Sequence, residues 1–141
     1  MNKKIKILIV RSRYHDTVKM YKKTLSIFKK RKLKHKMISV NGAFEIPAAI
    51  SRNIKKYDGF VAIGILIKGQ TPNFRFISQA IMHGLIQLSI FSKKPVGNAI
   101  LTCLNINQVK KRVNKGKEAL DAIIDVLENK SDLKIIKSKK K

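Results

Sequence analysis

The hexapeptide Lys-Gly-Gln-Thr-Pro-Asn at residues 68–73 carries groups that suit a phosphate site, directly after an apolar run. Thr71 and Pro72 are typical of a helix start, because a hydroxyl can cap the helix and proline lacks an N–H that would be unpaired there. Gly69 lets the backbone approach a ligand closely. A helix N-terminus attracts anions, and Lys68 adds a full positive charge. The stretch therefore indicates an anion-holding turn, although a capped helix without a ligand explains it equally well.

A second unusual stretch is Asn-Gly-Ala-Phe-Glu-Ile-Pro at residues 41–47. Asn41 and Gly42 are typical of a turn. Glu45 stands at the expected start of a helix, in a chain with only eight acidic residues. Its carboxylate can accept hydrogen bonds from ligand hydroxyls, or it can complement the helix dipole and do nothing more. On these residues alone both interpretations stay open.

Strands and helices must position these loops, and the two kinds of segment alternate along the chain. Short β-branched runs predict strands at residues 4–10, 36–40, 59–67 and 97–104. Helical patterns occupy residues 16–31, 45–55, 73–91, 107–113 and 115–128. This alternation predicts an α/β fold in which helices flank a four-stranded parallel sheet. Such sheets bind ligands beyond the carboxyl ends of their strands, where both unusual stretches fall.

The charge of the chain is strongly positive. It has 141 residues, of which 32 are basic and 8 acidic, giving a formal net charge of +24. Such a charge favours a polyanionic partner, for example RNA, DNA or an anionic membrane surface. The basic residues are spread over helices and termini, however, without the interleaved aromatic residues of single-strand binders. Lysine as a general surface residue is the favoured interpretation, and a nucleic-acid partner stays open.

The remaining composition limits the class of protein. The single Cys103 excludes an internal disulfide, no Cys/His pair has metal-ligand spacing, and no apolar run reaches the roughly 18 residues of a membrane span. The basic start and short apolar run predict a first strand and not a signal peptide. We expect a cytoplasmic protein without metal or membrane, with one domain over residues 1–133 and a disordered basic tail at 134–141.

Four motifs, in order, carry a resemblance to a known family. They are GAFEIP at 42–47, GILIKGQTPNF at 64–74, PVGNAILT at 95–102, and Arg112 followed by Lys115-Gly116. Together they resemble 6,7-dimethyl-8-ribityllumazine synthase, a cofactor-free transferase family of riboflavin biosynthesis. Its members condense 5-amino-6-ribitylamino-2,4-pyrimidinedione with 3,4-dihydroxy-2-butanone 4-phosphate. The resemblance implies a flavodoxin-like three-layer sandwich, assembled as pentamers or sixty-subunit shells with the active site between neighbours.

The resemblance also implies roles for individual residues. Substrate contacts fall on Tyr14, Ala43, Phe44, Glu45, Leu66, Ile67, Asn98 and Lys115. Phosphate contacts fall on Gly69, Gln70, Thr71 and Arg112. Tyr14 matches the ring that stacks on the pyrimidine, and Glu45 the acceptor for ribityl hydroxyls, while Asn98 and Lys115 match residues that line a neighbour's site. The planar guanidinium of Arg112 suits a phosphate better than an ammonium group does.

Asn73 departs from the family pattern, which usually has a histidine there as the candidate for proton transfer. Asparagine can hydrogen-bond but cannot exchange a proton near neutral pH. General acid–base catalysis contributes roughly 10²- to 10⁴-fold, or about 3–5 kcal/mol, whereas positioning two reactants can contribute about 7–11 kcal/mol. We therefore expect catalysis at a reduced rate, mainly by positioning. His15, in the first strand-end loop, is the alternative titratable group.

Two other functions stay open at this point. A catalytically impaired family member would bind ribityl-pyrimidine or flavin ligands without turnover, and a basic assembly would bind RNA or other polyanions. Tyr14, Glu45, Thr71 and Arg112 favour small-molecule binding or catalysis over the polyanion function. A scaffold for polyanions has no use for four ligand groups on four different loops.

Overall fold

The computed structural model describes residues 5–69 and 72–129, and their strands form one parallel sheet. The strands β1 (Lys6–Ser12), β2 (Lys34–Val40), β3 (Gly59–Ile67) and β4 (Val96–Cys103) lie in the order β2-β1-β3-β4. This confirms the predicted four-stranded parallel sheet, in an order typical of flavodoxin-like folds. The order reverses at β1 and β3, so ligands are expected beyond the carboxyl ends of these two strands.

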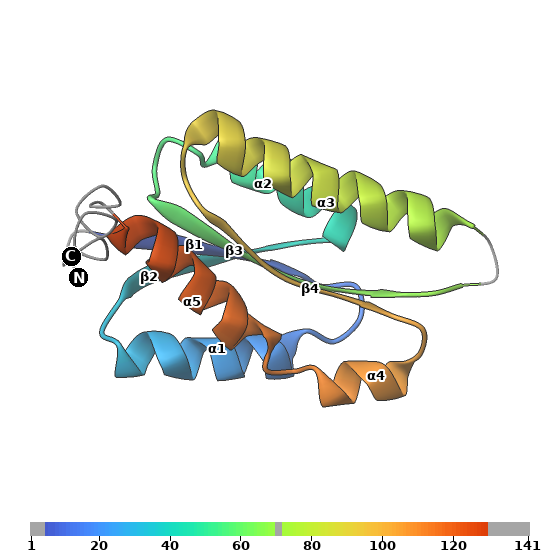
Figure 1. The fold of residues 1–141 in the computed structure, drawn as a ribbon. Helices are drawn as coiled ribbons and strands as arrows, with labels where there is room; N and C mark the ends of the chain where they lie inside the picture. The colour runs from blue at the N-terminus through green and yellow to red at the C-terminus, as the bar shows by residue number, and fades with distance from the viewer. Residues whose placement is uncertain (1–4, 70–71, 130–141) are drawn as a thin grey trace, which may run out of the picture.

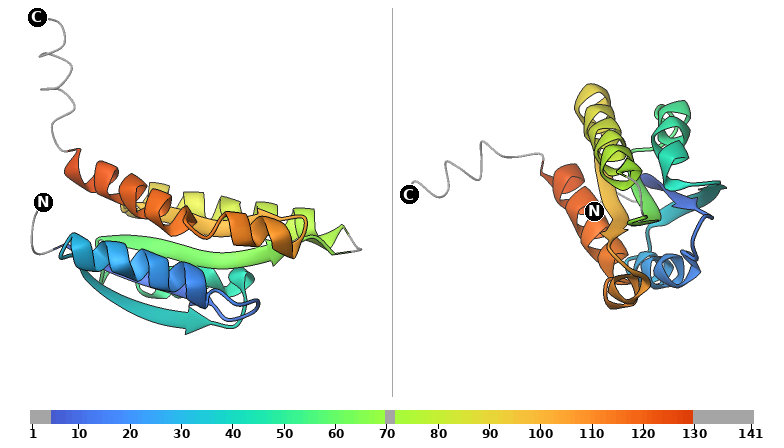
Figure 2. Two further views of the ribbon diagram at one scale, coloured as in Figure 1. Left: turned by 90° about the horizontal axis from the view of Figure 1, so that it is seen from below. Right: turned by 90° about the vertical axis from the view of Figure 1, so that its right-hand side faces the viewer.

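Helices cover both faces of the sheet, which gives three layers. On one face lie α1 (Val18–Lys30), α4 (Ile106–Lys111) and α5 (Lys115–Glu128) (Figure 1). On the other face lie α2 (Ile46–Arg52), preceded by the short 3₁₀ helix η1 (Ala43–Glu45), and α3 (Asn73–Ser92) (Figure 2). None of the described helices is long and apolar enough to cross a membrane.

β3 is the centre of two hydrophobic clusters, one on each face of the sheet. Val61 and Ile63 belong to the cluster with α1, α4 and α5, whereas Phe60 and Ala62 belong to the cluster with α2 and α3. Burial of a large apolar side chain contributes about 1.5–3 kcal/mol. Because both faces are covered, the strand is apolar throughout and does not alternate. This packing fixes the place where the carboxyl end of β3 emerges.

The predicted boundaries are mostly correct to within two residues, and the largest differences lie around α2. The helix ends at Arg52, short of the predicted residue 55, because the Asn53 side chain turns back and donates a hydrogen bond to the Ala49 carbonyl at 2.8 Å. β2 begins at Lys34 and not at residue 36, since Lys34 already pairs with β1. Neither the polar pair at residues 34–35 nor the short 3₁₀ helix has a strong sequence pattern.

Some predictions fall on residues outside the described ranges. They concern residue 4 of the first predicted strand, the phosphate residues Gln70 and Thr71, and the basic tail at 134–141. These predictions remain as stated.

Gly97 allows α5 to lie directly on β4, and its replacement is expected to destabilise the fold. A methyl group at Gly97 would lie 2.6 Å from the Ala119 carbonyl oxygen, which is too close for any real contact. A methyl group at Gly69 would meet no atom within 4 Å. We expect Gly97→Ala to lower the free energy of unfolding in urea by about 1–3 kcal/mol and Gly69→Ala to change it by less than about 0.5 kcal/mol. Equal stability of the two variants would contradict this packing.

Candidate functional site

Tyr14 lies just beyond β1, where backbone hydrogen bonds tie this loop to the end of β2. The amide of Arg13 donates to the carbonyl of Val40, and the amide of Tyr14 donates to that of Asn41, both at 2.8 Å. The Tyr14 side chain is 69% exposed, and its ring meets the ring of His15 edge-on with centroids 4.7 Å apart. An exposed, backbone-anchored aromatic ring can stack on a flat heterocycle.

His15 holds an unusual backbone conformation at the same place. Its φ of 62° lies in the left-handed region, which costs a non-glycine residue of the order of 1 kcal/mol. Backbone strain of this kind is frequent at functional sites, where the surrounding structure maintains it. Here the strained residue, His15, also contacts the ring of Tyr14.

The loop after β2 is closed by hydrogen bonds between Glu45 and Gly42 in both directions. Oε1 of Glu45 accepts from the Gly42 amide at 2.9 Å, and the Glu45 amide donates to the Gly42 carbonyl at 3.1 Å. Ala43 is buried beside β3, whereas the Phe44 side chain is 61% exposed. The exposed Glu45 carboxylate keeps further acceptor capacity. It can therefore shape the loop and still receive hydroxyl groups of a ligand.

The carboxyl end of β3 leads into the predicted phosphate turn. Leu66 and Ile67 are half-buried at the strand end, and the Lys68 amide donates to the Cys103 carbonyl of β4 at 2.9 Å. Gly69 is exposed, and open space surrounds the position of its missing side chain. Since the fold does not need a glycine there, the exposed backbone is available to a ligand.

α3 begins at Asn73, and Pro72 occupies its N-cap position. The predicted start of this helix at residue 73 is therefore confirmed, and the proline lies one position before the first helical residue. Proline offers no side-chain acceptor, so the first amides of this helix keep their capacity to bind an anion. Asn73 itself is exposed and brings an amide, not a titratable group, to this position.

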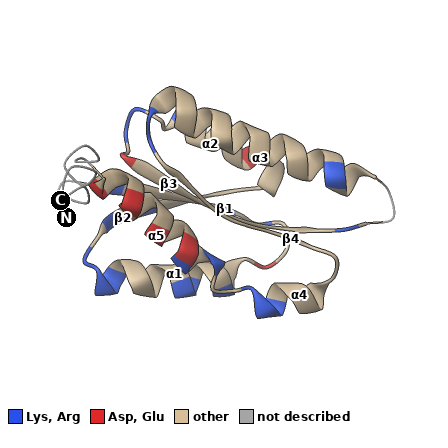
Figure 3. Cartoon of the chain, in the orientation of Figure 1, with Lys and Arg blue, Asp and Glu red and all other residues tan. Residues whose placement is uncertain are grey.

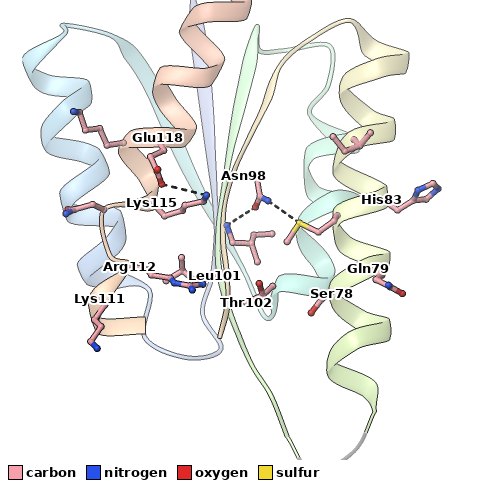
Figure 4. Close-up of a pocket in the computed structure, with 15 residues that line it drawn as sticks. Ser78, Gln79, His83, Asn98, Leu101, Thr102, Lys111, Arg112, Lys115 and Glu118 are labelled. Atoms are coloured by element: carbon pink, nitrogen blue, oxygen red, sulfur yellow. Dashed lines mark hydrogen bonds and ion pairs between the residues drawn. The ribbon is translucent and has the colours of Figure 1, made fainter. Parts of the chain in front are cut away.

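A cavity of about 1060 Å³ runs along β4, the edge strand of the sheet, between α3 on one face and α4 and α5 on the other (Figure 4). Three predicted site residues line it together: Asn98, Arg112 and Lys115. The Asn98 Oδ1 accepts a hydrogen bond from the Ile100 amide at 2.9 Å, and its Nδ2 lies 3.1 Å from the Met82 sulfur. Asn98 therefore satisfies an amide group of the edge strand and joins β4 to α3.

Arg112 ends α4 and brings a guanidinium group to the carboxyl end of β4. It is the C-cap residue of the helix, and its side chain hydrogen-bonds with the Cys103 thiol. Burial raises the pKa of the Cys103 thiol, while the positive charge of Arg112 and its hydrogen bond oppose that rise. Cys103 pairs with Ile67 across the sheet. Arg112 therefore lies at the carboxyl end of the edge strand, where it lines the cavity along β4.

The predicted site residues form two separate groups in the single chain. Tyr14, Ala43, Phe44 and Glu45 lie beyond β1 and β2, and none of them lines the cavity along β4. The strand β3 separates β1 from β4, a distance of about 10 Å between their axes. Neither group contains all the side chains that the resemblance implies for one site.

The described residues hold no group of three or more His, Cys, Asp or Glu side chains that could bind a metal ion. The chemistry available at both groups is therefore that of aromatic, amide, carboxylate, ammonium and guanidinium side chains and of backbone amides. These groups bind and orient polar ligands and anions.

Comparison with known proteins decides the family. A family model described as 6,7-dimethyl-8-ribityllumazine synthase matches residues 4–131. The chain belongs to this lumazine synthase family. A relative of that name from Bartonella tribocorum is 34% identical over 134 residues, which cover 88% of this chain and 89% of the relative. Another from Corynebacterium kroppenstedtii is 38% identical over 95 residues, or 62% of this chain and 60% of the relative.

A solved structure of a flavone reductase shares the fold. It superposes with a TM-score of 0.50 over 90% of this chain and 65% of its own, at 12% sequence identity. At that identity the likeness concerns the fold alone. It agrees with the flavodoxin-like arrangement expected for a lumazine synthase family member.

Several residues of the cavity have no role predicted from the sequence. Ser78, Gln79, Met82 and Thr102 also line it. Thr102 could have been predicted from the sequence, because strand alternation places it on the same face of β4 as Asn98. Met82 could not have been predicted, since an apolar residue in a helical pattern is indistinguishable from a core residue.

The pKa of the Cys103 thiol tests the position of Arg112 in this family member. Replacing Arg112 with Gln removes the charge and the hydrogen bond that oppose the effect of burial, so this pKa should rise further. Less thiolate is then present at a given pH, and the titration of the thiol moves to higher pH. Because Cys103 is buried and is the single cysteine, the ¹³Cβ chemical shift of labelled cysteine can follow this titration in the native protein, with Lys111→Gln as the control for general charge. A profile unaffected by Arg112→Gln would contradict the guanidinium–sulfur contact.

Proposed function

We propose that this chain condenses 5-amino-6-ribitylamino-2,4-pyrimidinedione with 3,4-dihydroxy-2-butanone 4-phosphate, giving 6,7-dimethyl-8-ribityllumazine, phosphate and water. This is the penultimate step of riboflavin biosynthesis. Membership of the lumazine synthase family supports the proposal. The observation in the molecule that carries it is the grouping of an exposed tyrosine, an exposed carboxylate and an open glycine backbone at the carboxyl ends of β1, β2 and β3.

The pyrimidine substrate fits the groups beyond β1, β2 and β3. Tyr14 stacks on the heterocycle, and the backbone at Leu66 and Ile67 hydrogen-bonds with its edge. Residues 43–45 hold the ribityl chain, with Glu45 as acceptor for its hydroxyl groups. Support comes from the exposure of the Tyr14 ring and from the spare acceptor capacity of the Glu45 carboxylate.

The phosphate of the second substrate belongs at the turn after β3. Gly69 offers open backbone, Gln70 and Thr71 offer polar groups, and Arg112 supplies a guanidinium fork. The start of α3 adds unpaired amides and a partial positive charge. These contacts hold the phosphate end of the ketone while its carbonyl meets the amine of the pyrimidine.

The complete site is proposed to form between two copies of the chain in a homo-oligomer, as the resemblance implies. Asn98, Arg112 and Lys115 line a cavity along the β4 edge that Tyr14 and Glu45 do not reach within the same chain. A neighbouring copy placed over this edge would bring the two groups together. The assembly is proposed to be a pentamer, or a shell of pentamers, acting on small-molecule substrates in the cytoplasm.

Asn73 places a limit on the mechanism. An amide can hydrogen-bond with the substrate or its phosphate, but it cannot carry a proton between them. Positioning an amine against a reactive ketone contributes about 7–11 kcal/mol, more than the roughly 3–5 kcal/mol that a general acid–base group contributes. The reaction therefore proceeds mainly by positioning, with solvent, substrate phosphate or His15 moving protons.

Lumazine formation from the two substrates tests the proposed function directly. The rate is expected to exceed that of the spontaneous reaction, and Glu45→Gln and Arg112→Gln should each lower kcat/KM by about tenfold to a hundredfold, the loss of one charge-assisted contact. Glutamine at 45 keeps an oxygen acceptor for the Gly42 amide, so the loop is preserved. Lys19→Gln, on the exposed side of α1, is the matched control. A rate no higher than the uncatalysed one would remove the enzyme proposal.

Co-expression of the same two variants tests whether the site is shared. Each variant lacks one of the two groups, so a mixed ring can rebuild an intact site where two different chains meet. Random pairing across a heterologous interface restores about one site in four. Recovery to about a quarter of the unsubstituted activity supports a shared site, whereas activity at the level of the single variants places the whole site within one chain.

His15 is tested by the pH dependence of lumazine formation. If its imidazole moves a proton, His15→Asn should flatten the change of kcat between about pH 6 and pH 7, the range in which histidines commonly titrate. Asn73→His should increase kcat, because it supplies a titratable group at the position where the family usually has one. A His15→Asn profile that overlays that of the unsubstituted protein would reject His15 and leave proton transfer to solvent or phosphate.

A further inference from the structure

A second hollow lies at the opposite edge of the sheet, at the amino ends of β1 and β2, away from every group assigned to the proposed reaction. Its volume is about 740 Å³. Four lysines line it, Lys6, Lys34, Lys36 and Lys56, together with Leu33, His35 and Tyr57. They come from three separate segments of the chain, so the cluster is produced by the fold and not by one lysine-rich stretch.

Strand geometry holds three of these lysines on one face. Lys6 and Lys34 are direct partners across β1 and β2, and Lys36 pairs with Leu8. Side chains two positions apart share a face, so all three lie on the face of Leu8, which is buried under α2 and α3. Their Cα atoms are about 5 Å apart across the strands and about 6.6 Å apart along β2. Lysines anchored at neighbouring positions of two strands bring like charges to one place, and an anion bound there reduces their mutual repulsion.

The segment after α2 contributes to the hollow. The helix α2 has only seven residues, and the chain that follows it lies beside the amino ends of β1 and β2. The segment after α2 forms a wall with Lys56 and Tyr57, and the Tyr57 ring is fixed against Phe60 with centroids 6.1 Å apart.

Among the described residues, Asp58 is the carboxylate beside this cluster, and it offsets at most one of the four lysine charges. It follows Tyr57, and its Oδ2 accepts a hydrogen bond from the Lys6 backbone amide at 2.8 Å. Half of the eight acidic residues of the chain lie on α5, which packs on the other face (Figure 3). The lysines of the hollow thus form a concentrated positive site beside the Tyr57 ring.

We propose that this hollow, the amino-edge pocket, binds a small polyphosphate, a linear anion with two or more linked phosphoryl groups. A single phosphate carries only about −1.5 to −2 charge near neutral pH, whereas a chain of phosphoryl groups brings a negative charge closer to that of four lysines. Nucleic acid fits less well, because the Tyr57 ring contacts Phe60 and the His35 ring contacts Phe28, so the pocket lacks a row of free aromatic rings on which successive bases could stack. The inference does not depend on lumazine formation.

Calorimetric titration of the full-length protein with tripolyphosphate tests the proposal, at an ionic strength of about 0.15 M where long-range attraction is screened. The triple variant Lys34→Gln, Lys36→Gln, Lys56→Gln should bind at least about tenfold more weakly, the combined contribution of three exposed ion pairs. The control variant Lys19→Gln, Lys22→Gln, Lys23→Gln loses the same charge from α1 and should bind almost as the unsubstituted protein does. Arg112 is unchanged in both, so binding at the phosphate turn contributes equally. Lumazine formation by the pocket variant should keep its kcat and KM.

Footprinting of the unsubstituted protein removes any dependence on how the variants fold. Tripolyphosphate should protect Lys34, Lys36 and Lys56 from an amine-reactive reagent, and leave Lys19 and Lys22 reactive. An equal loss of affinity in both triple variants, uniform protection of all lysines, or binding of inorganic phosphate as tight as that of tripolyphosphate would each overturn the proposal. So would tighter binding of a single-stranded oligonucleotide that depends on the same three lysines.

Discussion

The open edge of β4 is the constraint on which the rest of the molecule depends. A parallel sheet grows by crossover connections, and β4 is the outermost strand on its side. An edge strand exposes backbone groups, and natural proteins cover or protect such edges. Here the Asn98 side chain satisfies one edge amide, and a large cavity flanks the strand. The proposed reaction site, half of which lies on this edge, would be completed by another copy that covers it.

The two ends of the sheet have different chemistry, and the order of the strands accounts for the difference. The carboxyl end collects Tyr14, Glu45 and the open backbone at Gly69, which suit a polar substrate with a phosphate. The amino end collects paired lysines because β1 and β2 are adjacent and both begin with basic residues. The positive charge of the chain is therefore not distributed evenly over its surface. At least one part of it is arranged by the fold into a pocket.

Much of the fold could be predicted from the sequence, because burial on two faces gives a pattern that is hard to mistake. The boundaries of β3 and α5 were predicted to the residue, since a continuous apolar strand and an amphipathic helix both have clear limits. The 3₁₀ helix at Ala43–Glu45 was not, because a loop-closing hydrogen bond leaves no periodic pattern. The role of Gly97 was also hidden, since a close approach of α5 leaves no mark on the strand itself.

The residues of the candidate site could be predicted from the sequence, but their arrangement in space could not. Motif order identified Tyr14, Glu45, Asn98 and Arg112 together, but a sequence does not state which of them meet in one chain. The packing of Arg112 beside Cys103 required the course of α4 to be known. The separation of the two groups follows from strand order, and it is the feature that makes a shared site necessary for the proposed reaction.

A crystal structure of the assembled protein with 6,7-dimethyl-8-ribityllumazine and inorganic phosphate tests the central claim most directly. The account predicts the heterocycle on Tyr14 of one copy and the phosphate at the turn after β3 of that copy, with Arg112 of the adjacent copy reaching the phosphate. Ligands that contact Tyr14 and Arg112 of the same chain, or that bind away from the β4 edge, would contradict it.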